Sequence, residues 1–193
     1  MLLLMGLWSL NFILHSVLAD LRVKRFFRRI MGNAYPWYRL IYNLISVIGF
    51  SGLLLLHIRF PSNLLPINHL MLMIFGGVLF LLGGCFGYLS IKNYDIKEFT
   101  GVQQMRQLDK KNADLIRSGL NRHVRHPLYF SAILVLTGGF FLIPTEKNLW
   151  LLLISFLYIY IGTLLEERKL ILEFGASYRT YQREVKMLIP YVF

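Results

Sequence analysis

The sequence predicts an all-α integral membrane protein with about five transmembrane helices, the last two paired as a helical hairpin. Two bulk properties point to this class: 56% of the 193 residues are hydrophobic, and the mean hydropathy is +0.54. Soluble domains of this length carry fewer apolar residues. The third observation is that the apolar residues gather into runs close to the ~20 residues that a helix needs to cross a bilayer. We expect a single membrane domain, residues 1–193.

Three apolar runs in the N-terminal part are predicted spans: residues 1–19, 38–58 and 67–91, which together make up most of segment 1–91. The first run has no basic n-region and no small-residue cleavage site, so we interpret it as a retained span and not a removed signal. The third is rich in glycine. Small residues let membrane helices approach closely, so we expect these glycines to pack against a neighbouring helix.

Basic residues flank the apolar runs and indicate the topology. Five cations follow the first run: Arg22, Lys24, Arg25, Arg28 and Arg29. Because cytoplasmic loops of membrane proteins are enriched in Lys and Arg, segment 20–39 is predicted to be cytoplasmic and the N-terminus to lie outside. The polar segments 92–126 and 166–193 then also face the cytoplasm, the second as an amphipathic tail helix. The predicted location is an inner (plasma) membrane.

The net charge of +11 could also suit a nucleic-acid-binding protein. The basic residues, however, cluster at the ends of apolar runs, so we expect membrane lipids and not nucleic acid as partners. The one cysteine, Cys85, lies inside an apolar run. It can form no internal disulfide and no thiolate metal cluster, and no metal site is predicted.

The stretch that we expect to carry the chemistry surrounds the last two apolar runs. Residues 128–143 and 149–165 are joined by a polar turn, Thr145–Asn148, which predicts a helical hairpin over 127–165 with both ends at one membrane face. Arg125-His126-Pro127-Leu128-Tyr129 stands at its start, and Glu166-Glu167 follows its end.

Pro127 suits the first position of a helix, because its missing N–H costs nothing there, and it keeps His126 extended. The N–H groups of the next turn then form an anion-binding end beside Arg125 and His126. Two adjacent carboxylates near lipid cost energy unless a cation meets them, which Arg168 and Lys169 could do locally. A ligand with both a carboxylate and a cationic centre would find complementary charge here, and S-adenosylmethionine is such a ligand.

The order of these motifs resembles a known superfamily. Leu115–Leu120, the Arg-His-Pro-Leu-Tyr run, the acidic pair, and Phe174-Gly175-x-x-Tyr178-x-x-Tyr181 ending at Pro190 are similar to the isoprenylcysteine carboxyl methyltransferase and phospholipid methyltransferase superfamily of integral membrane enzymes. The opening, with His15-Ser16, Lys24-Arg25 and the run 38–43, resembles a bacterial branch that includes NnrU-like and thiol methyltransferase-like proteins.

This resemblance implies a site for S-adenosylmethionine as cofactor. The residues that it assigns to cofactor binding are Gly119, His126, Pro127, Tyr129, Glu166 and Glu167. Arg125 and Glu167 are the predicted catalytic residues. Where the family has an aromatic residue two positions after the glycine, this chain has Asn121, which removes the usual partner for adenine stacking. Structural roles stay open beside these: Arg125 and Tyr129 could anchor the membrane interface, and His126 could cap the bend.

The implied activity is transfer of a methyl group from S-adenosylmethionine to a lipophilic acceptor, a carboxylate, thiol or amine, at the cytoplasmic membrane face. The acceptor would be a lipid or a lipophilic small molecule. One alternative is a haem-binding or quinone-binding subunit, because intramembrane histidines such as His15 can be axial ligands. The other is an inactive family member that acts as a scaffold.

Overall fold

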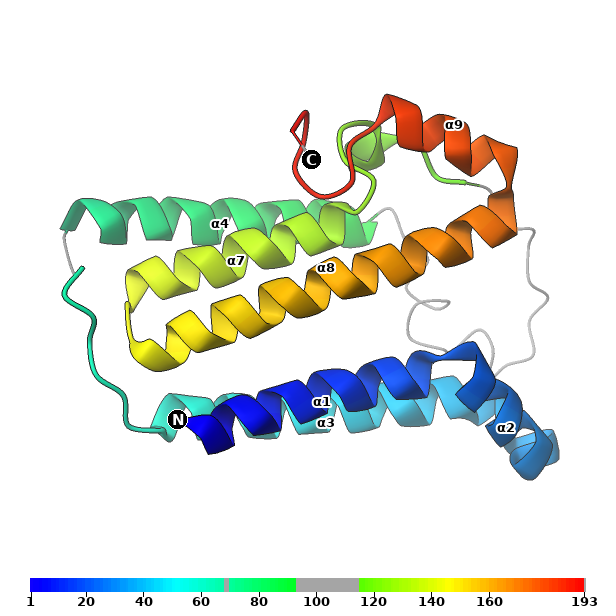
Figure 1. Ribbon diagram of the computed structural model, residues 1–193, viewed down its shortest axis with the longest axis horizontal. Coiled ribbons are helices and arrows are strands. Elements are labelled where there is room, and N and C mark those ends of the chain that lie inside the picture. Colours follow the sequence, from blue (N-terminus) through cyan, green and yellow to red (C-terminus); the bar gives the residue numbers. More distant parts are fainter. Residues whose placement is uncertain (68–69, 93–114, 193) are drawn as a thin grey trace. The chain divides into compact units, whose positions relative to one another are not determined.

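The computed structural model describes residues 1–67, 70–92 and 115–192 (Figure 1). Regular structure in these ranges is helical, as predicted, and the all-α membrane class is confirmed. The elements are α1 (Leu2–Ala19), α2 (Leu21–Met31), the 3₁₀ helix η1 (Gly32–Trp37), α3 (Tyr38–Arg59), α4 (Leu70–Lys92), the 3₁₀ helix η2 (Gly119–Arg122), α7 (Pro127–Leu142), α8 (Glu146–Phe174) and α9 (Ala176–Glu184). Most of the predicted cytoplasmic segment 92–126 lies outside the described residues.

Four helical stretches of the described residues are long and apolar enough to cross a membrane: α1, the continuous run Leu21–Arg59 that ends in α3, α4 and α8. The helix α7 is apolar but has only 16 residues, a length of ~24 Å. A bilayer core is ~30 Å thick, so α7 is short for a full crossing. The count of five spans and the orientation remain predictions.

The chain divides into two compact units, one of which holds Met1–Pro61 and the other the described residues from Ser62 onward. In the first unit, α1 and α3 form a hairpin whose core is Trp8. Its indole Nε1 donates to His57 Nδ1 at 3.2 Å, and its ring meets Phe50 edge-on. Near the other end of the hairpin, Tyr38 Oη donates to the Leu18 carbonyl at 2.8 Å. Hydrogen bonds at both ends therefore hold the two helices together.

In the second unit, small residues bring α4 and α7 into close contact. A Cβ atom added to Gly138 would lie 2.5 Å from Phe80 N and 2.6 Å from the Gly76 carbonyl oxygen. Further along the pair, Ser131 Oγ donates to the Gly83 carbonyl at 2.8 Å. The prediction that glycines of residues 67–91 pack against another helix is confirmed for these positions.

The turn between α7 and α8 is earlier than predicted. The sequence indicated a turn over Thr145–Asn148, but α8 begins at Glu146. The cause is a side-chain cap, because Thr145 Oγ1 accepts a hydrogen bond from Asn148 N at 3.4 Å. The polar residues after Thr145 therefore form the first turn of the helix.

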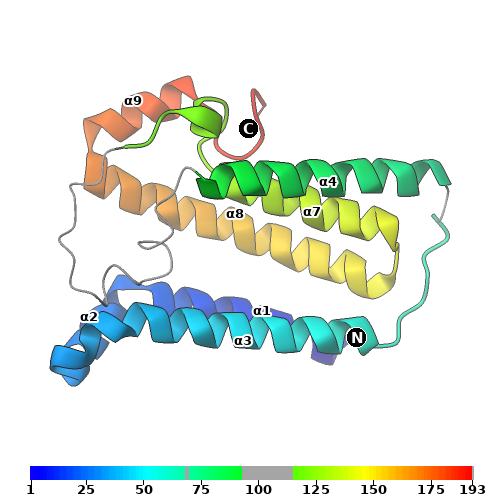
Figure 2. The ribbon, with the colours of Figure 1, turned by 180° about the vertical axis from the view of Figure 1, so that it is seen from behind.

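The backbone conformation at the end of α8 sets the direction of α9 and the C-terminal segment. Gly175 has φ +57°, a left-handed conformation that ends α8 and lets α9 fold back. After α9 the chain runs beside the segment that precedes α7, where Arg125 N donates to the Lys186 carbonyl at 2.8 Å and His126 N to the Met187 carbonyl at 3.2 Å. Figure 2 shows α9 and the C-terminal segment gathered at one end of α4, α7 and α8. The tail is thus packed against the start of the hairpin.

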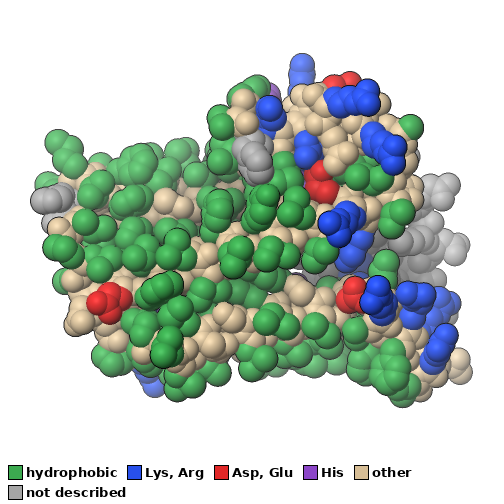
Figure 3. All heavy atoms as spheres, in the orientation of Figure 1, with side chains coloured by type: hydrophobic (Ala, Val, Ile, Leu, Met, Phe, Trp, Pro, Cys, Tyr) green, Lys and Arg blue, Asp and Glu red, His purple; other side chains and the backbone are tan. Residues whose placement is uncertain are grey.

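On the face shown in Figure 3, apolar side chains cover most of the helices, and Lys and Arg side chains gather over α2 in the first unit and around α9 in the second. Exposed apolar residues of α1, α3, α4 and α8 are the surface expected of lipid-facing helices.

Candidate active site

The site is built around Glu167, which lies about two helical turns past the middle of α8. Four buried residues spaced four apart form one face of this helix: Ser155, Ile159, Thr163 and Glu167. This spacing keeps the side chains on one side, so the buried face of α8 leads directly to the carboxylate. The Glu167 side chain is only 8% exposed.

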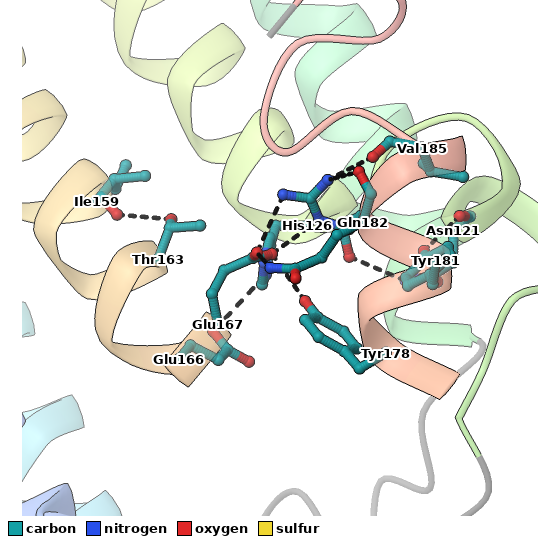
Figure 4. A network of polar contacts seen from close by, with 11 residues as sticks. Asn121, His126, Ile159, Thr163, Glu166, Glu167, Tyr178, Tyr181, Gln182 and Val185 are labelled. Carbon is teal, nitrogen blue, oxygen red and sulfur yellow. Dashed lines mark hydrogen bonds and ion pairs between the residues drawn. The ribbon is translucent and has the colours of Figure 1, made fainter. Parts of the chain in front are cut away.

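Five donors from four residues meet the Glu167 carboxylate (Figure 4). Arg125 binds it with two nitrogens, Nε to Oε1 at 2.8 Å and Nη2 to Oε2 at 3.0 Å. His126 Nε2 lies 2.8 Å from Oε1, and Tyr178 Oη donates to the same oxygen at 2.7 Å. Gln182 Nε2 donates to Oε2. Burial disfavours a charged carboxylate, but a bidentate guanidinium and three further donors stabilise the ionised form.

The Arg125 guanidinium, like the Glu167 carboxylate, has hydrogen-bond partners for most of its polar groups. Its Nη1 donates to the Gln182 carbonyl at 3.2 Å and also to the Val185 carbonyl. Four of its five N–H bonds therefore have partners, and its side chain is 9% exposed. A buried ion pair is tolerated when hydrogen bonds satisfy the remaining groups, as they do here. The pair joins α8, the start of α7 and the end of α9 into one structure.

His126 lies between the two glutamates. Because Nε2 faces the Glu167 carboxylate, we assign the ring proton to Nε2. Nδ1 then faces Glu166, whose Oε2 lies 3.8 Å away. The ring stacks on Tyr129, with 5.6 Å between centroids and 21° between planes. With its ring turned to the carboxylates, His126 makes no side-chain hydrogen bond to the first turn of α7.

The two adjacent acids have different environments. The Glu166 side chain is 42% exposed, whereas Glu167 is enclosed. The cation that meets Glu167 is Arg125, which is distant in the sequence, and the local Arg168 and Lys169 proposed from the sequence are not needed for it. Glu166 is thus the acid that stands at the open side of the cluster, next to His126.

The segment before α7 is shaped by Gly119 and Asn121. Gly119 has φ +62°, in the left-handed region that favours glycine. Asn121 is buried, and its Nδ2 donates to the Arg125 carbonyl at 3.2 Å. Tyr181 Oη donates to the Asn121 carbonyl. Where the resemblance implies an aromatic residue, Asn121 instead holds the backbone of Arg125 in place.

Tyr178 is a site residue that sequence reasoning missed. Burial, together with its hydrogen bond to the Glu167 carboxylate, raises the pKa of Tyr178 above its usual value. The phenol therefore stays protonated and remains a donor. Gln182 was missed as well. Both lie one turn apart on the same face of α9, a spacing visible in the sequence, but nothing in that spacing names Glu167 as their partner.

The structure brings together most of the predicted site. Arg125, His126, Glu166 and Glu167 form one cluster; Pro127 begins α7 beside it, and Tyr129 stacks on His126. Gly119 lies in the segment that leads into the cluster. Their catalytic and cofactor-binding roles stay predictions. Among the described residues, no group of three His, Cys, Asp or Glu could hold a metal ion.

Comparison with known proteins agrees with the motif order. The profile of a family described as "Protein of unknown function (DUF1295)" matches residues 1–185. The chain is 39% identical over 72 residues to methanethiol S-methyltransferase 1 of Bradyrhizobium diazoefficiens, a match covering 37% of this chain and 25% of that protein. It is 42% identical over 73 residues to methanethiol S-methyltransferase of Pseudomonas deceptionensis, covering 37% of this chain and 26% of that protein.

A third relative is methanethiol S-methyltransferase of Crocosphaera subtropica, 37% identical over 73 residues, covering 37% of this chain and 27% of that protein. The chain thus spans about a quarter of the length of these curated relatives. No solved structure matches the chain significantly. The match along nearly the whole chain shows that this protein belongs to the DUF1295 family, within the superfamily of integral membrane methyltransferases that its motifs resemble.

Proposed function

We propose that this protein transfers a methyl group from S-adenosylmethionine to a small thiol at the membrane. The observation that carries the proposal is the position of His126, which lies 2.8 Å from Glu167 and 3.8 Å from Glu166 although the motifs are some 40 residues apart. The thiol acceptor is suggested by the relatives, each named a methanethiol S-methyltransferase.

The residues of the cluster fit S-adenosylmethionine by their chemistry. The half-exposed Glu166 carboxylate suits an ammonium group or ribose hydroxyls. The N-terminal end of α7, which His126 leaves without a side-chain cap, suits a carboxylate. The left-handed Gly119 allows a ligand to approach the backbone closely. Tyr129 offers a ring face at the same place.

The cofactor supplies an activated methyl group, bound to a positively charged sulfur, which a thiolate can attack directly. The residues of the chain position the methyl group and the acceptor and exclude water from them. We assign binding to Gly119, His126, Tyr129 and Glu166. Arg125 and Glu167 act as positioning residues, because their hydrogen-bonding groups are taken up by each other and by residues of α9 and the tail.

A thiol is a poor nucleophile until it loses its proton, and a small thiol is almost entirely protonated near neutral pH. His126 Nδ1 carries no proton in the tautomer assigned above, so it is the group in the cluster that can accept the thiol proton. The adjacent Glu166, at 3.8 Å, would stabilise the imidazolium that results.

The proposed location is the cytoplasmic face of a bacterial plasma membrane. The cations after α1 support this side for α2, because Lys and Arg concentrate in cytoplasmic loops. The source of the relatives supports a bacterial membrane. A water-soluble cofactor would be available on that side.

The test is methyl transfer by the purified protein in lipid nanodiscs. Methyl-labelled S-adenosylmethionine is supplied with methanethiol, and headspace gas chromatography follows labelled dimethyl sulfide. The expected result is product formation that falls at least tenfold in His126→Ala. Label appearing only in the lipid fraction would assign a lipid acceptor instead, and cofactor binding without transfer to any acceptor would support the scaffold alternative.

A further inference from the structure

The helix α2 is strongly amphipathic. At 100° per residue, five apolar residues fill one continuous arc of about 140°, namely Val23, Phe26, Phe27, Ile30 and Met31. The five cations occupy the opposite side: Arg22, Lys24, Arg25, Arg28 and Arg29. Leu21, at the start, is the one apolar residue on the cationic side. Such complete separation is typical of a helix that lies in a membrane interface.

Only part of the apolar side of α2 packs against other residues of the first unit. Phe27 meets Tyr38 with 5.1 Å between ring centroids, whereas Phe26 and Ile30 are 58% and 64% exposed. No residue of α2 is buried. Two neighbouring large side chains thus present apolar surface that the described part of the protein does not cover.

Two cations of α2 contact aromatic rings of the elements that follow it, one in α3 and one in η1. Lys24 lies over the Tyr42 ring at 5.6 Å, and Arg28 lies over the Tyr35 ring at 5.8 Å. Arg22, Arg25 and Arg29 are exposed. Three guanidinium groups therefore point outward on a helix whose orientation is already fixed.

The position of α2 in the first unit indicates that it lies at the membrane surface. It stands between α1 and α3, the long apolar helices of the candidate spans Leu2–Ala19 and Leu21–Arg59, and it lies beyond the end of their hairpin in both ribbon views (Figures 1 and 2). Asp20 caps its start by accepting from Arg22 N at 2.7 Å, and Gly32, with φ +50°, ends it. A short helix closing a transmembrane hairpin lies at the membrane surface.

We propose that α2 is a binding surface for anionic phospholipids. Phe26 and Ile30 enter the boundary between headgroups and acyl chains, and Arg22, Arg25 and Arg29 bind the acidic headgroups. Nucleic acid would satisfy the same cations but would leave Phe26 and Ile30 in water. A charged bilayer surface accounts for both sides of the helix.

The test compares lipid preference in the full-length protein. Spin-labelled phosphatidylglycerol and phosphatidylcholine compete for the protein in nanodiscs, and electron paramagnetic resonance gives their relative association constant. We expect a preference of several-fold for phosphatidylglycerol that is mostly lost in the triple variant Arg22→Gln, Arg25→Gln, Arg29→Gln. The matched control, Arg168→Gln, Arg179→Gln, Arg183→Gln, removes three exposed arginines elsewhere and should keep most of the preference. An equal loss in both triples overturns the proposal.

A second measurement tests the apolar side. Hydrogen exchange of residues 21–31 should be slower in nanodiscs containing phosphatidylglycerol than in those of phosphatidylcholine alone. Phe26→Gln combined with Ile30→Gln, which keeps every charge, should remove that protection, with thermal unfolding used to confirm that the variant folds. Equal exchange in both lipids, or α2-dependent binding of a single-stranded oligonucleotide without any lipid preference, would contradict the assignment.

Discussion

Arg125 and Glu167, 42 residues apart in the sequence, form a buried bidentate ion pair with N···O distances of 2.8 and 3.0 Å. The pair joins the segment before α7 to the last turns of α8, and the same guanidinium also donates to the carbonyls of Gln182 and Val185 at the end of α9. The ion pair and these two hydrogen bonds therefore hold α9 and the tail against the end of α7 and α8 that is proposed to face the cytoplasm. Any ligand beside His126 binds to a surface whose shape this pair maintains.

Glu167→Gln should destabilise the protein strongly. The change leaves Arg125 as a buried charge without its counter-ion, a loss of about 3–5 kcal/mol in comparable pairs. Thermal unfolding in detergent should show a clear fall in the melting temperature. The control is Glu166→Gln, at the half-exposed neighbour, which should change stability by less than ~0.5 kcal/mol. Equal effects of the two changes would mean that the ion pair does not hold the fold.

Tyr178→Phe should loosen α9 without altering its packing. The ring is kept and one hydrogen bond to a charged carboxylate is lost, which costs about 1.5–3 kcal/mol. Hydrogen exchange across residues 176–184 should accelerate. The matched control, Tyr88→Phe, removes the hydroxyl of an exposed tyrosine on α4 and should leave exchange unchanged. Unchanged exchange in Tyr178→Phe would show that Gln182 and Arg125 suffice to hold α9.

The same tyrosine has a defined pH dependence. Its pKa is raised in the folded protein by burial first and by Glu167 second, so its stabilising contribution is complete below the unfolded value of ~10 and is lost only as pH rises through the folded value. Between pH 7 and pH 9 the stability difference between wild type and Tyr178→Phe should therefore stay constant. Chemical unfolding at several pH values checks this, and a difference that shrinks below pH 9 would contradict it.

Gly138→Ala should separate α4 from α7. The new Cβ would lie 2.5 Å from Phe80 N, a backbone atom that cannot move by itself, and overpacking of this kind costs about 1–3 kcal/mol. The neighbouring Gly139→Ala is the control, because nothing lies within 4 Å of its added Cβ. Alanine favours a helix over glycine, so this control should unfold at the same temperature or higher. Similar melting temperatures for both variants would argue against the close helix contact.

Cofactor affinity should depend on the open side of the cluster. Glu166→Gln and His126→Ala should each weaken S-adenosylmethionine binding by about tenfold or more, the effect of losing one hydrogen bond to a charged group. Isothermal titration calorimetry in detergent measures this. Glu173→Gln, an exposed acid two turns further along α8, should bind normally. Unchanged affinity in both test variants would show that the residue assignment is wrong.

Much of the membrane architecture was predictable because it depends on local properties. The predicted spans 1–19, 38–58 and 67–91 agree with α1, α3 and α4 to within a few residues, since an apolar run in lipid must satisfy its backbone hydrogen bonds within itself. The start of α8 was wrong by a few residues because a single cap at Thr145 turned polar residues into a helical turn. Hydropathy measures composition and does not register such a cap.

The partners within the site were harder to predict. The motif order named Arg125, His126, Glu166 and Glu167, and the structure places them together. It also adds Tyr178 and Gln182 from α9, whose direction depends on the left-handed Gly175. A break in a helix can be expected from a glycine, but the angle at which the next helix leaves cannot.

The sequence by itself determined that this chain is a helical membrane protein, which segments are apolar, and which charged residues stand at the ends of the last hairpin. Only the tertiary structure decided that Glu167 turns inward to Arg125 while Glu166 remains beside His126 at the open side. Adjacent residues on a helix differ by about 100° in direction. Which of them faces the protein therefore depends on the helices packed around α8 and not on the residue type.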